Sequence, residues 1–241
     1  MRVFVAGATG ATGKLVVEQL LERGYEVIAI VRSFERIPEN IRKNTDLSIK
    51  KASLLDLSDE EIAVYVKGCD AVISCLGHNL NLRGIYGKPR KLVTEAVERL
   101  CYAVRKSNPD KPVKFVLMNT TANINLDLKE KISFGQKIVL SIIRMLIPPQ
   151  IDNEKAADYL RLNIGQNDEL IEWVSVRPDA LIDMDRVSEY ELHVSPIRSA
   201  VFNPGKTSRI NVAHFMAELI DNQNTWDCWK GKMPVIYNVE R

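Results

Sequence analysis

The sequence predicts an α/β protein whose strands form one doubly wound parallel sheet, and two observations support this prediction. Short apolar runs alternate with segments in which apolar residues recur at helical spacing, which is typical of β-α-β units. The first apolar run, residues 3–6, ends in a glycine-rich turn and is followed by a helical segment. A strand, a tight glycine turn and a helix, in that order, open a Rossmann-type fold.

The remaining elements follow at regular intervals. Further strands are expected at residues 26–31, 47–51, 71–75, 113–118 and 173–176. Ser58 and Glu61 form a capping box that begins a helix, and apolar residues between 92 and 104 form the inward stripe of a longer one. We therefore expect a single domain over residues 1–241.

Two segments break this alternation. Residues 123–152 and 179–210 show neither a clear strand nor a clear crossover helix in the expected order. Ligands of such sheets lie beyond the carboxyl ends of the strands. We therefore predict that both segments are insertions on the substrate side of a single domain.

Composition narrows the class of protein. Lys and Arg number 33 against 31 Asp and Glu, a net charge of +2, so neither nucleic acid nor an anionic membrane is expected as partner. The four cysteines contain no CxxC pair and form no metal-like cluster with the three histidines, which indicates reduced thiols and no metal site. The longest apolar stretch, 138–147, is interrupted by Arg144 and is too short to span a bilayer. A cytoplasmic protein with a small-molecule ligand, as monomer or homodimer, is expected.

The glycine turn predicts a phosphate site. Gly7, Gly10 and Gly13 allow the backbone to approach a pyrophosphate, and the N–H groups at the start of the following helix face the anion. A P-loop would place four residues between its first glycine and Gly-Lys, whereas five separate Gly7 from Gly13, and Leu15 follows Lys14. The turn is therefore predicted to hold a dinucleotide.

The end of the second strand predicts which dinucleotide is bound. Arg32 stands about 20 residues beyond the glycines, where the adenosine ribose is held. A guanidinium there suits the 2′-phosphate of NADP(H), whereas a carboxylate would suit NAD. Ser33 and Thr12 add hydroxyl donors. The alternative is that Arg32 is a solvated charge at a strand end.

Several motifs resemble the atypical short-chain dehydrogenase/reductases, especially the NmrA-like and flavin-reductase-like (biliverdin-reductase-B-like) members. These motifs extend over nearly the whole chain and are residues 7–13, 31–32, 54–56, 71–77, 173–178 and 208–213. The resemblance implies that Asp56 contacts adenine, and that Leu76, Gly77 and the Arg177-Pro178 turn flank the nicotinamide half. The cofactor-binding residues expected from the glycine turn and the resemblance are Gly7, Thr9, Gly10, Ala11, Thr12, Gly13, Arg32, Ser33, Leu55, Asp56, Cys75, Leu76, Gly77, Thr120, Lys155 and Pro178.

The helix that carries Tyr-x-x-x-Lys in ordinary members of this superfamily matches residues 151–160. Lys155 resembles the retained lysine, which places Ile151 where the tyrosine would be, and Tyr159 is not a displaced copy. The family's serine matches Thr120 or the next threonine. The resemblance therefore implies Lys155 and Thr120 as catalytic residues, the alternative for Lys155 being a solvent-facing charge.

The missing tyrosine indicates the kind of acceptor. Reduction of an ordinary carbonyl needs a positioned acid, whereas a flavin or quinone delocalises the added charge and collects protons from water. The leading hypothesis is an NADPH-dependent reductase acting on a flavin, quinone or related conjugated acceptor. The alternative is a non-catalytic NADP(H) redox sensor that acts through a protein partner; nucleotide-sugar epimerisation, which normally relies on the tyrosine, is weaker. His78 and His193 are minor candidates as proton donors.

Overall fold

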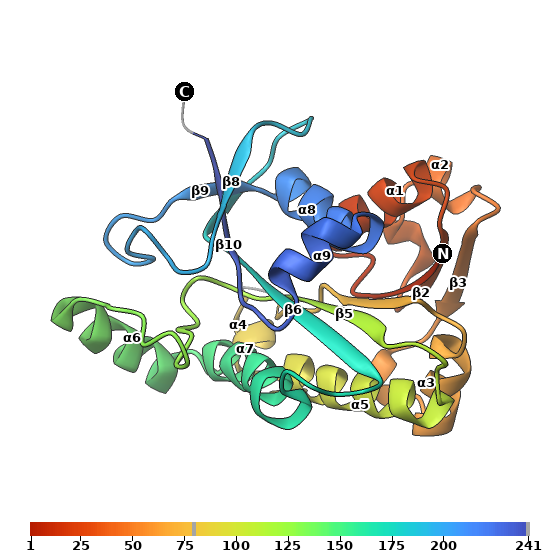
Figure 1. The fold of residues 1–241 in the computed structure, drawn as a ribbon, viewed down its shortest axis with the longest axis horizontal. Coiled ribbons are helices and arrows are strands. Elements are labelled where there is room, and N and C mark those ends of the chain that lie inside the picture. Colours follow the sequence, from red (N-terminus) through yellow and green to blue (C-terminus); the bar gives the residue numbers. More distant parts are fainter. Residues whose placement is uncertain (79–80, 240–241) are drawn as a thin grey trace.

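A computed structural model describes residues 1–78 and 81–239, and their main sheet has eight strands in the order β3-β2-β1-β4-β5-β6-β10-β8 (Figure 1). Neighbouring strands pair in parallel except β10 with β8. The bounds are β1 (Arg2–Ala6), β2 (Glu26–Val31), β3 (Leu47–Lys51), β4 (Ala71–Ser74), β5 (Val113–Met118), β6 (Ile171–Pro178), β8 (Tyr190–His193) and β10 (Val235–Asn238). The predicted doubly wound parallel sheet is confirmed, with an antiparallel edge that the sequence analysis missed.

Helices cover both faces of the sheet (Figure 1). One face is covered by α1 (Gly13–Glu22), α8 (Arg209–Asp221) and α9 (Gln223–Trp229). The other is covered by α3 (Asp59–Val66), α5 (Leu92–Ser107) and α7 (Pro148–Tyr159). The capping box predicted at the start of α3 is present, because Ser58 accepts from the Glu61 N–H and the Glu61 carboxylate accepts from the Ser58 N–H.

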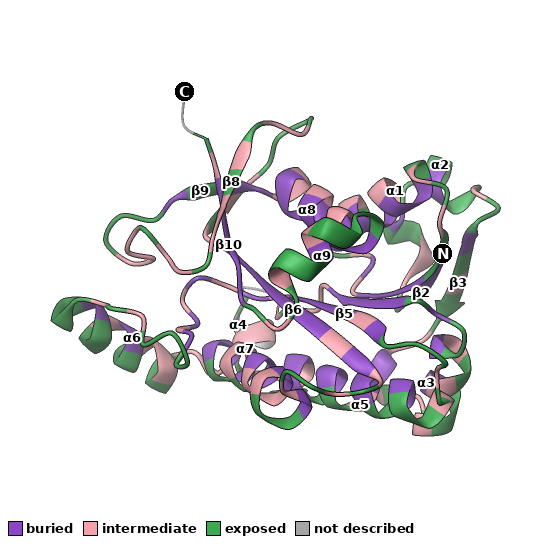
Figure 2. Cartoon of the chain, in the orientation of Figure 1, coloured by how far each residue is buried: buried purple, intermediate pink, exposed green. Residues whose placement is uncertain are grey.

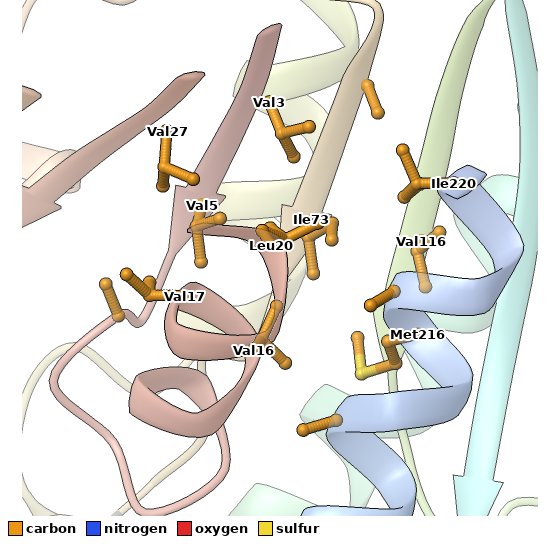
Figure 3. Packing of buried hydrophobic residues seen from close by; sticks show 14 of the residues in the cluster. Val3, Val5, Val16, Val17, Leu20, Val27, Ile73, Val116, Met216 and Ile220 are labelled. Atoms are coloured by element: carbon orange, nitrogen blue, oxygen red, sulfur yellow. The ribbon is translucent and has the colours of Figure 1, made fainter. Parts of the chain in front are cut away.

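The core follows from strand alternation. Val3 and Val5 point toward α1 and α8, where they pack with Leu20 and Met216 (Figure 3). Phe4, between the two valines, points to the opposite face and joins the cluster under α3, α5 and α7. Because both faces are buried, the central strands are apolar throughout rather than alternating, as a parallel sheet requires.

The two irregular segments hold their own elements. Residues 123–152 contain α6 (Phe134–Leu146) and the start of α7. Residues 179–210 contain β8 and a small parallel sheet of β7 (Ala180–Ile182) with β9 (Lys206–Ser208). The remaining short elements are α2 (Glu39–Arg42), α4 (Leu82–Tyr86), two 3-10 turns (Phe34–Arg36 and Leu54–Asp56) and one π-helical turn (Leu160–Ile164).

A buried ion pair joins these segments to the sheet. The Arg177 guanidinium, on β6, is fully buried and pairs with the buried Glu130 carboxylate, with Nη2 2.7 Å from Oε1. The same guanidinium donates to the carbonyls of Asn123, Val194 and Met233. The sequence analysis placed Arg177 beside the nicotinamide; in the structure its charged group is instead enclosed where both segments meet the sheet.

Removing one partner of this pair is expected to destabilise the fold strongly. Glu130→Gln leaves the Arg177 charge buried without its counter-ion, a loss on the order of 3–5 kcal/mol in the free energy of unfolding. Denaturant unfolding measures it. The control is Asp183→Asn, which breaks the ion pair of Asp183 with Arg209; because the Asp183 side chain is 86% exposed, the loss should stay below about 1 kcal/mol. Equal losses in the two variants would contradict a structural role for the buried pair.

Candidate functional site

A cleft of about 150 Å³ opens at the carboxyl ends of β1 and β4, where the strand order reverses direction. This is the place where open α/β sheets bind their ligands. Eight of the residues predicted from sequence line it together: Gly7, Thr9, Gly10, Arg32, Leu55, Cys75, Leu76 and Gly77. The other lining residues are Ala6, Ile30, Val31, Arg36, Ala52, Ser53, Leu54, Pro89 and Leu92.

The glycine turn at the base of the cleft is packed too tightly for any side chain. Gly7 has φ +80°, and a Cβ there would lie 2.7 Å from the Cys75 carbonyl carbon. A Cβ on Gly13 would lie 2.1 Å from the Gly7 carbonyl oxygen, which also accepts from the Gly10 N–H at 2.9 Å. The glycines therefore allow three backbone segments, the ends of β1 and β4 and the start of α1, to meet.

The start of α1 offers donors to an anion. The first N–H groups of a helix have no acceptor within the helix, and the Thr12 side chain does not cap them. They add to the positive end of the helix dipole. Ala11 and Thr12 lead directly into this end, and Gly13 begins the helix. The glycine cradle and the uncapped helix start fit the pyrophosphate of a dinucleotide.

Two arginines line the cleft near the end of β2. Arg32 follows β2, and the 3-10 turn of residues 34–36 brings Arg36 into the same lining. The sequence analysis missed Arg36, although its spacing from Arg32 within a turn was the available signal. The Ser33 hydroxyl donates to the Glu35 carboxylate, which lowers the pKa of Glu35. Ser33 is therefore engaged with a neighbouring acid and does not line the cleft.

The wall expected to contact adenine is built from backbone and apolar groups. Ser53, Leu54 and Leu55 line the cleft, as predicted for Leu55. Asp56 is exposed and does not line it, and the Asp56 N–H is bonded to the Ser53 carbonyl at 3.0 Å. The structure thus brings the residues beside Asp56, rather than its carboxylate, to the cleft.

The opposite side of the cleft is apolar. Leu76 and Gly77 line it after β4, together with Pro89 and Leu92 across the opening. Burial raises the pKa of the Cys75 thiol to about 12. Cys75 is therefore neutral at physiological pH, and it contributes shape rather than reactivity.

Three predicted residues lie at strand ends and helix surfaces outside this lining. The Thr120 hydroxyl accepts from the Ala122 N–H at 3.3 Å, and the Pro178 carbonyl accepts from the Thr121 N–H at 3.1 Å. Both groups fix the loops that follow β5 and β6. Lys155 is exposed and lines a separate groove between α5 and α7 that also includes Tyr159. The structure does not bring Lys155 to the cleft.

Helical spacing explains which residues of α7 face the sheet. The buried residues of α7 include Asp152, Ala156 and Ala157, and Asn153 shares their stripe because it precedes Ala156 by three positions. The Asn153 carbonyl also accepts from the Asn119 side chain, at the end of β5, at 2.9 Å. The backbone of α7 at Asn153, which the sequence analysis did not select, therefore contacts the end of β5, whereas Lys155 is exposed. Tyr159, three positions after Ala156, packs partly buried against the cluster under α3, α5 and α7, and no tyrosine is among the described residues that line the cleft.

A buried polar cluster holds α7 against α5 beside the cleft. Asp152 accepts from the N–H groups of Val93 at 2.8 Å and Thr94 at 3.0 Å. Its Oδ2 also lies 2.7 Å from His78 Nε2, while His78 Nδ1 lies 3.1 Å from the Gly84 carbonyl. Burial by itself would raise the pKa of Asp152, but these hydrogen bonds outweigh it and hold the pKa below its usual value. His78 therefore has a structural contact rather than an open edge toward substrate.

The other two histidines do not line the cleft. His193 Nε2 lies 3.4 Å from a Glu191 carboxylate oxygen, and His214 Nδ1 lies 2.9 Å from the Tyr190 hydroxyl. Within residues 1–78 and 81–239, no group of three or more His, Cys, Asp or Glu side chains could hold a metal ion.

The glycine contacts predict the effect of a single added methyl group. Gly13→Ala should displace the turn, lower the affinity for NADPH at least about tenfold and cost on the order of 1–3 kcal/mol in the free energy of unfolding. Calorimetric titration and denaturant unfolding measure the two effects. The control is Gly135→Ala on α6, where the nearest atoms would be 3.5 Å away, an ordinary contact. Unchanged NADPH affinity in Gly13→Ala would refute this cradle.

The Asp152 cluster predicts acid sensitivity. Because the pKa of Asp152 is lower in the folded protein than the unfolded value of about 3.9, its stabilising effect is complete above that value and is lost as the pH falls through the folded pKa. Asp152→Asn should cost about 1–3 kcal/mol at neutral pH and flatten the decline in unfolding free energy below about pH 4. Asp185→Asn, on an exposed residue, should keep the slope of the unmodified protein. An unaltered slope in Asp152→Asn would contradict the assignment.

Comparison with known proteins agrees with the fold and the cleft. Over 76 residues the chain is 42% identical to an uncharacterized chloroplastic protein of Arabidopsis thaliana, a match that covers 32% of this chain and only 27% of that protein. A candidate NADH-flavin reductase from Streptococcus pneumoniae superimposes with a TM-score of 0.67 at 21% identity, over 99% of this chain and 100% of that one. A short-chain dehydrogenase/reductase from Veillonella parvula, in complex with NADP, superimposes with a TM-score of 0.70 at 13% identity. The match covers 98% of this chain and 94% of that one. These two structures are similar in fold.

A protein-family model described as NAD(P)H-binding matches residues 7–223, which include the glycine turn, both arginines and β6. The match extends over most of the chain and agrees with a cleft built for a nicotinamide dinucleotide. The chain therefore belongs to the NAD(P)H-binding family, and its fold is of the Rossmann type.

Proposed function

We propose that this protein is an NADPH-dependent reductase that transfers hydride to a flavin, a quinone or a related conjugated small molecule. The observation that carries the proposal is the cleft itself, which has two guanidinium groups at one end and an apolar wall without a tyrosine at the other. The relative that is a candidate NADH-flavin reductase supports the acceptor class by analogy.

The preference for NADP(H) rests on Arg32 and Arg36. Among the described residues neither guanidinium forms an ion pair, and both line the cleft. A 2′-phosphate would receive paired, charge-assisted hydrogen bonds from them. The 2′-hydroxyl of NAD(H) would leave both cations without a counter-charge. The neighbouring Glu35 carboxylate accepts from Ser33, so it has a partner other than the arginines.

The proposed acceptor class rests on the lining of the cleft, which has no Tyr, His, Asp, Glu or Lys side chain among the described residues. On α7, Tyr159 lines the outer groove, and Asp152 is a carboxylate that already accepts several hydrogen bonds. Bound NADPH would supply the hydride. The chain's own contribution is then to position the dinucleotide through the glycine turn and to present an apolar wall at Leu76 and Leu92 to a flat ring. The reduced ring takes its protons from water.

The cofactor preference gives a direct test. Arg32→Ala and Arg36→Ala should each weaken NADPH binding about tenfold or more, because a hydrogen bond to a charged group contributes about 1.5–3 kcal/mol, and should leave NADH binding nearly unchanged. Calorimetric titration with both dinucleotides measures this. The control Lys43→Ala removes an exposed cation just after α2 that does not line the cleft. Tighter binding of NADH than NADPH by the unmodified protein would mean that the arginines have another role.

Turnover gives the second test. NADPH oxidation should be measurable with flavins and quinones and should be absent or much slower with simple aldehydes and ketones, because only the conjugated rings do without a positioned acid. The fall in absorbance of the NADPH nicotinamide ring measures the rate of NADPH oxidation. Tight NADPH binding without turnover on any acceptor would instead favour a redox sensor, which would bind a protein partner differently in the presence of NADP and NADPH.

A further inference from the structure

Helix α6 displays an apolar face to solvent. Phe134, Ile138, Ile142 and Met145 lie on one side of the helix, and their exposed fractions are 79%, 47%, 46% and 75%. They line a shallow groove with Lys137 and Ser141. Figure 2 shows α6 projecting from the body of the molecule with much of its surface exposed. A face of this kind on a folded protein marks an interaction surface.

The opposite side and both ends of α6 are fixed to the rest of the protein. Leu140 points inward and is 1% exposed. The Arg144 guanidinium bonds to the Glu154 carboxylate at 2.9 Å, and the Tyr86 hydroxyl donates to the Leu146 carbonyl at 3.0 Å. Ser133 caps the first turn through the Gln136 N–H. The helix is therefore held with its apolar face outward, rather than poised to fold over the cleft.

The charge around this face has one sign. Lys129 and Lys131, just before α6, and Lys137 on its groove are exposed, and none forms an ion pair with another described residue. Of the two acids in the same stretch, Glu130 is buried with Arg177, and Asp127 pairs with Arg161, which also pairs with Asp158. The surface that remains carries lysines beside bulky apolar side chains.

We propose that α6 docks this protein onto the surface of an anionic phospholipid bilayer. A short amphipathic helix with lysines beside an apolar face lies in the plane of the headgroups, with its apolar side chains inserted and its cations near the lipid phosphates. With 13 residues, α6 would lie on the bilayer, and no helix in the described part of the chain is long and apolar enough to cross one. The proposal does not depend on the proposed reductase activity.

Charge favours a lipid surface over a second copy of the chain. In a two-fold dimer built on this face, the same patch meets itself, so the lysines of one copy would approach those of the other. On an anionic bilayer, by contrast, each of these lysines can lie near a lipid phosphate. The long methylene stem of Lys137 can extend along the apolar groove while its ammonium group reaches the phosphates.

Vesicle sedimentation tests the proposal with the full chain. The protein should sediment with vesicles of mixed phosphatidylcholine and phosphatidylglycerol and remain free with phosphatidylcholine alone, and added salt should weaken the binding. Lys137→Gln should lower the partition coefficient about fivefold, and Phe134→Ser about tenfold or more. The matched controls Lys111→Gln and Leu162→Ser, on exposed residues away from α6, should bind as the unmodified protein does.

A spectroscopic variant separates insertion from charge attraction alone. The tryptophan emission of Phe134→Trp should shift to shorter wavelength with the anionic vesicles and not with the neutral ones. Absence of sedimentation with anionic vesicles, or equal loss in the control variants, would overturn the proposal. A concentration-dependent dimer in light scattering that Phe134→Ser abolishes, without vesicle binding, would assign the face to a second copy of the chain.

Discussion

The close approach of backbone at Gly7 and Gly13 is the constraint on which the site depends. The Gly7 carbonyl contacts the start of α1, and Gly7 itself contacts the chain that leaves β4. These contacts set where α1 begins and therefore where the N–H groups of its first turn point, of which that of Lys14 is bonded to the Gly10 carbonyl. They also bring Cys75 and Leu76 to the glycine turn, so that one packing arrangement builds two walls of the cleft. Cofactor position is thus a consequence of backbone packing more than of any single polar side chain.

The buried ion pair of Arg177 and Glu130 has the corresponding role for the two irregular segments, residues 123–152 and 179–210. Backbone carbonyls from both irregular segments and from the stretch before β10 accept from one guanidinium. If the loops moved, the buried Arg177 guanidinium would lose its ion pair and several hydrogen bonds, which costs more free energy than the loss of an apolar contact. The buried charge therefore favours a single arrangement of the loops. The loops after β5 and β6 are further fixed by backbone hydrogen bonds at Thr121 and Asn119. Substrate-side geometry is therefore specified from inside the protein.

The sequence predicted the elements that local patterns determine and missed those that depend on distant partners. The strands at 26–31 and 113–118 match the structure at both ends, because largely apolar runs bounded by polar residues mark buried parallel strands. The strand at 47–51 also matches, although it lies at the sheet edge and is mostly exposed. Lys155 was expected at the cleft because a motif match ignores helix phase, and a shift of two positions moves a side chain to the opposite side of α7. Arg177 and Glu130 are 47 residues apart, and no local pattern links them.

The net charge of the chain likewise carries no information on how charged residues are arranged on the surface. The net charge of +2 is a sum over the whole chain, so it does not show that Lys129, Lys131 and Lys137 lie together on one exposed stretch while Glu130 is buried with Arg177. The same internal pairing that fixes the substrate-side loops thereby makes their outer surface basic. Helix α6 is attached to α7 through Arg144 and Glu154, and α7 is attached through Asp152 to the first turn of α5, whose Leu92 lines the cleft. The exposed apolar face is therefore linked to the cleft through two intervening helices.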